Sequence, residues 1–205
     1  MTYSEYKYLI LSDLYRRKRS VKFKTLFKEL LTGESYKYVF WMRTCTYSRS
    51  HPFLRYSIYR IAKIMYKHYT YKFAISINIS TQIGSGFFIG HFSGIFINKR
   101  CIIGKNCNIS QGVTLGGTHK GFPVLKDNIY IGPGAKLVGN ILIGNNVTIG
   151  ANCVVTKDIP DNSVVVGIPG IVISETGTEG YIINTEYDEV LTYALAKREA
   201  NHEKD

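Results

Sequence analysis

The chain of 205 residues lacks several features that would assign it to a common class. No apolar run reaches the roughly 18 residues that a membrane-spanning helix needs. Met1 is followed by polar and aromatic residues, not by an apolar core with a small-residue cleavage site, so we expect no signal peptide and a cytoplasmic location. The four cysteines form no Cys-x-x-Cys pair, which argues against a disulfide framework or a zinc site.

Acidic residues are scarce in the first 75 residues, which hold 4 Asp and Glu against 16 Lys and Arg, a charge of +12. Residues 76–205 hold 11 acidic and 10 basic residues, so that part is close to neutral. The basic excess is therefore confined to an N-terminal segment. No recognition motif accompanies this charge, so we expect no nucleic-acid partner.

Aliphatic residues recur at every sixth position through the middle of the chain. The clearest run is Ile131, Leu137, Ile143, Ile149 and Val155, and earlier runs are Ile77, Ile83, Ile89 and Ile95, then, after a slip of two, Ile97, Ile103, Ile109 and Leu115. A period of six is typical of a parallel β-helix, in which each short strand buries its aliphatic side chain. An ordinary β-sandwich would not keep this phase for so long. Cys101, Cys107 and Cys153 occupy inward positions of the repeat, which predicts buried thiols.

The pattern divides the chain into three parts. Residues 1–75 form a basic, mainly helical segment, residues 76–170 the β-helix, and residues 171–205 a tail with a polar helix near 189–200. The clearest N-terminal helix is predicted over 52–69, with Leu54, Ile58, Ile61 and Met65 on its apolar face. The basic segment, including the cluster of residues 16–19, either caps the first coil or is attracted to an anionic surface such as membrane lipid, and both can hold.

Two interruptions of the repeat mark candidate functional positions. His91 stands beside Gly90 at the two-residue slip, where it is either a structural histidine or a general base, since imidazole titrates near neutral pH. Between Leu115 and Leu125 four extra residues predict an extruded loop that contains His119, which either faces the same cleft or faces water. Only these two histidines lie in the coils, so we expect no metal site.

Three segments carry a resemblance to a known family: IGSGFFIGHFSGIFIN, IGKNCNISQGVTLGGT and IGPGAKLVGNILIGNNVTIGANCVVTKDIP. Over about residues 76–170 the chain resembles the serine acetyltransferase branch of the hexapeptide-repeat acyltransferases. The resemblance implies an all-β left-handed parallel β-helix, a homotrimer with active sites between neighbouring subunits, and acetyl-CoA as co-substrate.

The resemblance also implies roles for individual residues. His91 matches the catalytic histidine, which would take a proton from the acceptor hydroxyl. Backbone N–H groups near Gly116, Gly117 and Thr118 would bind the cofactor arm and the oxyanion. The cofactor groove would include Pro133 and Ala151, one coil apart. Lys157 either meets a CoA phosphate or is a solvated lysine. His119 and Gly90 would lie on the acceptor side.

The chain departs from the family pattern on that acceptor side. Gly90 stands where serine acetyltransferases have an aspartate, Ser76 stands where they have the aspartate that supports the histidine, and the Arg-His pair before the loop proline is absent. From these departures we expect an acetyl-CoA-dependent O-acetyltransferase that acts on a hydroxyl of a sugar, in a surface polysaccharide or its precursor. The alternatives are a serine O-acetyltransferase of cysteine biosynthesis and a non-catalytic β-helix scaffold. The charge of the first 75 residues suggests peripheral contact with the inner face of the membrane.

Overall fold

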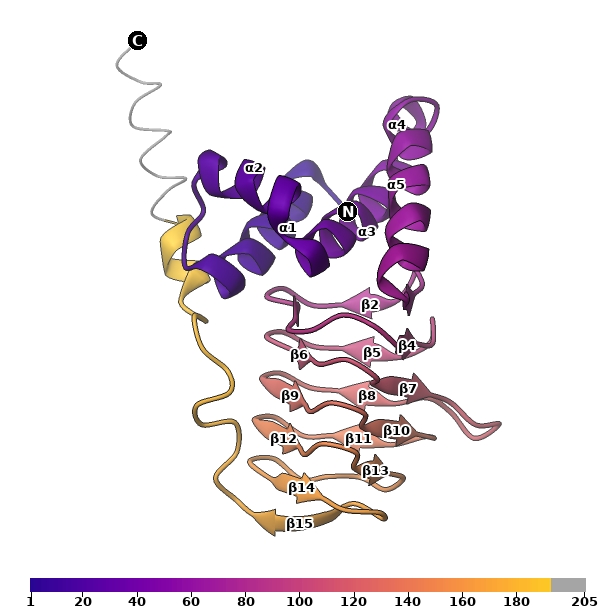
Figure 1. Ribbon diagram of the computed structural model, residues 1–205, viewed down its shortest axis with the longest axis vertical. Helices are drawn as coiled ribbons and strands as arrows, with labels where there is room; N and C mark the ends of the chain where they lie inside the picture. The colour runs from indigo at the N-terminus through magenta and orange to yellow at the C-terminus, as the bar shows by residue number, and fades with distance from the viewer. Residues whose placement is uncertain (193–205) are drawn as a thin grey trace.

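The computed structural model describes residues 1–192, which form a helical cap on a stack of short strands (Figure 1). The cap consists of five helices: α1 (Tyr3–Lys18), α2 (Phe23–Thr32), α3 (Glu34–Arg49), α4 (Pro52–Arg55) and α5 (Ile58–Phe73). Within the described residues, no helix is long and apolar enough to cross a membrane.

The stack is a parallel β-helix with three sheets, as the period of six predicts. Sheet A contains β1 (Ile75–Ile77), β4 (Ile95–Ile97), β7 (Thr114–Gly116), β10 (Lys136–Val138) and β13 (Val154–Val155). Sheet B contains β2 (Gln82–Ile83), β5 (Ile102–Ile103), β8 (Val124–Leu125) and β11 (Leu142–Ile143). Sheet C contains β3 (Phe88–Ile89), β6 (Asn108–Ile109), β9 (Ile129–Ile131), β12 (Val147–Ile149), β14 (Val164–Val166) and the antiparallel β15 (Ile171–Ser174).

The residues of the six-residue period build the core of this stack. Every aliphatic of the run from Ile131 to Val155 is buried, and of the earlier ones Ile83 alone is half-buried. Cys101, Cys107 and Cys153 are buried and free, as predicted from their inward positions, and so is Cys45 in the cap. Strands of successive coils pair in register, for example Ile97 with Leu115, so the buried side chains form columns inside the prism.

The three corners between the sheets have different chemistry, and we name them for use below. The Asn corner, between sheets B and C, stacks Asn106, Asn128, Asn146 and Asn162, each with positive φ and joined by side-chain amide hydrogen bonds of 2.9 to 3.0 Å. The Gly corner, between sheets C and A, stacks Gly94, Gly112 and Gly134, at φ of 67°, 72° and 73°. The loop corner, between sheets A and B, carries the extruded loop.

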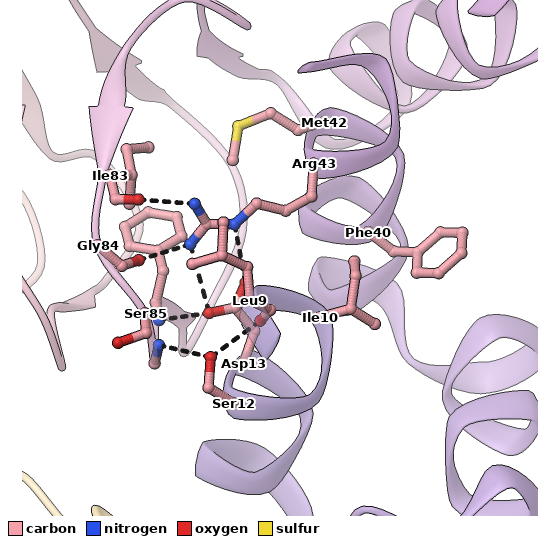
Figure 2. A network of polar contacts seen from close by, with 12 residues as sticks. Leu9, Ile10, Ser12, Asp13, Phe40, Met42, Arg43, Ile83, Gly84 and Ser85 are labelled. Atoms are coloured by element: carbon pink, nitrogen blue, oxygen red, sulfur yellow. Dashed lines mark hydrogen bonds and ion pairs between the residues drawn. The ribbon is translucent and has the colours of Figure 1, made fainter. Parts of the chain in front are cut away.

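The cap covers the open end of the β-helix and satisfies the backbone groups that have no coil above them. Arg43 of α3 donates to the carbonyls of Ile83 (2.7 Å) and Gly84 (2.6 Å), and its Nε lies 3.0 Å from Asp13 of α1 (Figure 2). The same Asp13 accepts from the Phe87 N–H at 2.7 Å. Because buried backbone groups need hydrogen-bond partners, this network holds the cap against the first coil.

The cap differs from the predicted helical segment in two ways. The helix expected over 52–69 is split at Tyr56 and Ser57 into α4 and α5, and α5 continues to Phe73. Its packed face is not the predicted one: Ile58 and Ile61 are exposed, whereas Ala62 and Phe73 are buried. Aromatic side chains supply much of the contact with the first coil, and a simple apolar-face analysis gave them too little weight.

The basic cluster at residues 16–19 is also not a free surface. Arg16 is buried and donates to Gly86 O, Ile183 O and Asn108. Arg17 and Lys18 both pair with Glu29. The cluster therefore holds the cap together and is not available to an anionic partner as a unit.

The tail runs back along the stack from its far end to the cap (Figure 1). We call residues 175–187 the strap. The ring of Tyr181 packs against that of Tyr130 of sheet C, with the centroids 4.3 Å apart and the planes tilted by 31°, and Asn108 donates to Tyr181 O at 2.9 Å. At the cap end the Tyr187 hydroxyl bonds to Ser85 and Asn106. The polar helix predicted near 189–200 begins at Tyr187, and most of its predicted length lies outside the described residues.

Candidate active site

His91 lies in an insertion at the Gly corner. The turns that follow β6 and β9 use one pattern, in which Gly134 N donates to Gln111 O, and Gly112 N donates in the same way to Ser93 O. Ser93 therefore corresponds to Gln111, and the turn between β3 and β4 contains two extra residues, His91 and Phe92. The slip in the six-residue phase is this insertion.

The insertion presents His91 to the outside. Phe92 turns inward and packs against Phe73 at the end of α5, with the ring centroids 4.8 Å apart. Gly90, just before the insertion, still makes the regular hydrogen bond to the next coil, since its N–H donates to Ile109 O at 2.9 Å. The His91 side chain is exposed. An exposed imidazole on a turn that is anchored on both sides is suited to proton transfer with a bound molecule.

Pro133 and Ala151 lie on the same corner, in the turns after β9 and β12. Pro133 O accepts from Asn152 N at 2.7 Å, so the two turns stack. A Cβ added at Gly132 would come within 2.8 Å of Ala151 N, so glycine is needed for this close approach. The Gly corner therefore brings together His91, Gly90, Pro133 and Ala151 along one edge of sheet A.

The extruded loop lies on the other edge of sheet A. Figure 1 shows it projecting from the stack next to β7. Thr118 and Gly121 pair with each other, N to O, at 2.9 and 3.3 Å, which leaves His119 and Lys120 at the exposed tip. A Cβ at Gly117 would fall 2.2 Å from the Phe122 ring, so glycine is required for the loop to close over this ring.

The predicted cofactor residues are consequently not brought together within one chain. Gly116, Gly117, Thr118 and Lys157 lie at the loop corner, whereas Pro133 and Ala151 lie at the Gly corner. The Thr118 N–H is used by Gly121 O, so it is not a free oxyanion donor. Lys157 is exposed, two coils further along the loop corner. Sheet A separates the two groups, and a site that uses both corners needs a second copy of the chain.

Two residues near the Gly corner were missed by the sequence analysis. The Gln111 Oε1 atom is buried and has no hydrogen-bond partner among the described residues. Lys136, on sheet A, donates to Gly112 O and to Thr114 Oγ1. Neither residue interrupts the six-residue period. Because interruptions of that period, such as the one at His91, marked the candidate positions, both were passed over.

A cavity of about 550 Å³ lies elsewhere, between the cap and sheet B. Met42, Arg49, Thr81, Ile83 and Ile102 are among its lining residues, and none of the predicted site residues is. Among residues 1–192, no three His, Cys, Asp or Glu side chains gather as a metal site would require. The candidate site is thus an open edge of the β-helix and not an enclosed pocket.

Comparisons with known proteins agree with the fold and name a related activity. Residues 122–157 match the family model described as bacterial transferase hexapeptide (six repeats), so the repeat of the β-helix is this hexapeptide. The chain is 41% identical over 132 residues to a serine acetyltransferase of Bacillus pumilus, a match that covers 62% of the chain and 61% of that relative. The chain thus spans less than two thirds of the length of this curated relative.

Two solved structures are similar over most of the chain. Serine acetyltransferase of Brucella abortus in complex with coenzyme A has a TM-score of 0.68 at 27% identity and covers 85% of this chain and 70% of that one. Soybean serine acetyltransferase complexed with serine has a TM-score of 0.66 at 27% identity and covers 83% and 70%.

These relatives overturn the expected sugar acceptor. The expectation of a polysaccharide hydroxyl rested on missing charges at Gly90 and Ser76 and in the loop, whereas the relatives are named for transfer to serine. The physical weakness of that inference is visible in the geometry. The Gly corner and the loop corner of one chain lie on opposite edges of sheet A, so the residues around one chain's His91 are an incomplete basis for naming an acceptor.

Proposed function

We propose that this protein is an acetyl-CoA-dependent O-acetyltransferase whose acceptor is serine. The observation that carries the proposal is the exposed His91, inserted into the Gly corner of a transferase hexapeptide β-helix that is 41% identical to a serine acetyltransferase. His91 is the proposed general base, and Pro133 and Ala151 line the cofactor groove.

The proposed reaction needs one proton acceptor and one thioester. His91 takes the proton from the serine hydroxyl as the oxygen attacks the carbonyl carbon of acetyl-CoA. The tetrahedral intermediate collapses, the carbon–sulfur bond breaks, and the CoA thiolate leaves and takes up a proton. The products are O-acetylserine and CoA with a free thiol.

The Gly corner suits a narrow, extended substrate such as the pantetheine arm. Ala151 is exposed and has a small side chain, so little covers the backbone of the stacked turns at this position. The proposed site is completed by the loop corner of a neighbouring copy, which would contribute Gly116, Gly117, Thr118, Lys157 and His119. A homotrimer is the proposed assembly, because three such prisms can pair corners in a closed ring.

The departures at Gly90 and Ser76 make the acceptor the part of the proposal that most needs a test. The full-length protein is incubated with acetyl-CoA, and free thiol is measured with and without L-serine. Thiol release that depends on serine, together with O-acetylserine identified by mass, supports the proposal. Release that depends on no acceptor indicates hydrolysis, and no release with any hydroxyl compound indicates a non-catalytic β-helix. Either result contradicts the proposed function.

A further inference from the structure

The outer face of α4 and α5 exposes large apolar side chains that the fold does not use. Phe53 is 94% exposed, Tyr56 76%, Ile61 60%, Ile64 68% and Tyr71 74%. We call these five residues the apolar stripe. Their exposure is well beyond what packing in this chain requires, because exposed apolar residues of a monomer usually occur singly and not as a group.

The stripe lies opposite the face with which α5 contacts the rest of the protein. Ala62 and Phe73 are buried, and Tyr66 and Tyr69 pack against the core of the β-helix. At 100° per residue, Ile64 and Tyr71 point away from these four side chains. The stripe therefore cannot be buried by a small shift of α5, and no other part of residues 1–192 covers it.

The charge around the stripe has one sign. Residues 52–73 contain five basic residues, Arg55, Arg60, Lys63, Lys67 and Lys72, and no Asp or Glu occurs between Glu34 and Asp127. The elements that α5 contacts most are α3, α4 and β1, and beyond Glu34 at the start of α3 these three contribute no carboxylate. None of these five cations belongs to an ion pair within residues 1–192.

We infer that the outer face of α4 and α5 binds peripherally to an anionic lipid bilayer. Apolar side chains enter the boundary of the acyl chains while Lys and Arg contact anionic head groups, which is the combination that interfacial helices use. A second copy fits less well, because a self-complementary interface would bring the same cations together without a carboxylate between them. α4 and α5 stand beyond the end of the β-helix (Figure 1), so the stack does not block a planar surface there.

The lipid-binding surface does not include the basic cluster at residues 16–19 as a unit. The cluster at residues 16–19 has the highest local charge in the sequence, but Arg16 is buried and Arg17 and Lys18 pair with Glu29. The lipid-binding surface is therefore assigned to α4 and α5, whose cations form no ion pair with any residue the structure describes. This assignment does not depend on the proposed acetyl transfer.

The test is co-sedimentation of the full chain with vesicles of phosphatidylglycerol and phosphatidylcholine at low and high salt. Wild type should sediment at low salt, and binding should fall as salt rises, because screening shortens the reach of the charges. The variant Arg60→Glu/Lys67→Glu should bind at least about tenfold more weakly, since each basic residue near the surface contributes separately. The variant Phe53→Ser/Ile64→Ser should also weaken binding, and more so at high salt.

Matched controls separate this surface from net charge and from general hydrophobicity. Lys99→Glu/Lys105→Glu changes the net charge by the same amount on the exposed β-helix, and Ile171→Ser/Ile173→Ser removes exposed apolar residues at the far end of the stack. Both should bind like wild type. The inference is overturned if wild type does not sediment at low salt, or if test and control variants lose binding equally. It is also overturned if Phe53→Ser/Ile64→Ser leaves vesicle binding intact but yields a smaller assembly in light scattering, which would identify a second copy as the occupant.

Discussion

His91 is the residue whose environment separates a catalytic role from a structural one. It is exposed on an inserted turn, and Phe92, not His91, anchors that turn in the core. His91→Ala should therefore fold and assemble as wild type does. Acetyl transfer should fall by about a hundred- to ten-thousand-fold, the usual cost of removing a general base.

The measurement is steady-state thiol release at saturating serine, with thermal unfolding as a check on folding. The cap variant His68→Ala is the control, because it removes an exposed histidine outside the proposed site, and it should transfer acetyl as wild type does. Transfer by His91→Ala within about threefold of wild type, against the factor expected for a general base, would remove His91 from the site.

The four cysteines make a second prediction at the scale of single residues. All are buried, and burial raises the pKa of Cys107 and Cys45 to about 12 and that of Cys101 to about 11. Because the thiolate is the reactive form, native protein at pH 8 should react with a disulfide reagent far more slowly than protein unfolded in guanidinium. Fast reaction of one thiol in the native state would mean that its coil opens.

Single residues were predictable where they break a pattern. His91 was found because two extra residues shift the phase of the repeat, and the loop was found in the same way. Gln111 and Lys136 were not found. Lys136 lies between two buried residues, which is normal for an outward position of a hexad, and Gln111 lies in the turn at the Gly corner, where a polar residue breaks no pattern. Only the folded structure shows that the Gln111 oxygen is buried and has no hydrogen-bond partner within residues 1–192.

At the scale of elements, the cap depends on the pair of Arg43 and Asp13. Burial raises the pKa of Asp13, and the Arg43 guanidinium and the Phe87 N–H oppose that rise. In Arg43→Met the carboxylate loses its partner, and the carbonyls of Ile83 and Gly84 lose their donor. We expect the free energy of unfolding at pH 7 to fall by about 3–5 kcal/mol, as for other broken buried pairs.

The loss should depend on pH in a defined direction. Without Arg43, Asp13 has a folded-state pKa further above its unfolded value of about 3.9. The part of the loss that comes from the unpaired carboxylate is then absent below about pH 4 and grows as the pH rises toward the folded-state pKa. The part that comes from the carbonyls of Ile83 and Gly84 remains at every pH. Urea unfolding at pH 4.5 and pH 7 measures this. Arg49→Met, on the exposed end of the same helix, is the control, and an equal loss in Arg49→Met and Arg43→Met would contradict the role of the pair.

The strands were predictable and the helices only in part, for a physical reason. Each coil needs an aliphatic residue at the same position, because the interior of the β-helix is narrow. The sequence pattern therefore repeats over many coils and is easy to recognise. The cap has no repeat. Its contacts are made by tyrosine hydroxyls and arginines that reach carbonyls of the first coil, such as Tyr38 to Ile77 O at 3.2 Å. The apolar-face pattern therefore predicted that Ile58 and Ile61 pack against the protein, whereas both are exposed.

At the scale of the whole molecule, the strap links the far end of the β-helix to the cap. Its contacts join residues that are distant in sequence, such as Arg16 with Ile183 and Thr148 with Gly177. Such contacts leave no periodic pattern in the sequence. The sequence therefore predicted a tail but not that it runs back along sheet C to the cap. The strap also covers the outer surface of sheet C, which leaves sheets A and B as the faces available to another copy.

Tyr187 is the point at which the strap is fastened, and it gives the last prediction. Its hydroxyl donates to Asn106 at 2.8 Å and lies 3.0 Å from Ser85 Oγ, so it closes the asparagine column of the Asn corner at the cap end. Tyr187→Phe leaves both groups without this partner in a buried place. Since an unpaired buried polar group costs about 1–3 kcal/mol, unfolding in urea should show a loss of that size.

Tyr8→Phe is the matched control, because Tyr8 packs in the same cluster while its hydroxyl bonds to Asp188 on the surface. Its loss should stay within about 0.5 kcal/mol, as for other surface changes. Hydrogen exchange adds a readout of position. If the strap fastens the cap, Tyr187→Phe should speed exchange in α1 around Arg16 and leave sheet A near β10 protected. Faster exchange spread evenly over the whole β-helix, or none in α1, would mean that Tyr187 supports only its local cluster and that the cap is held by Arg43 and Asp13 alone.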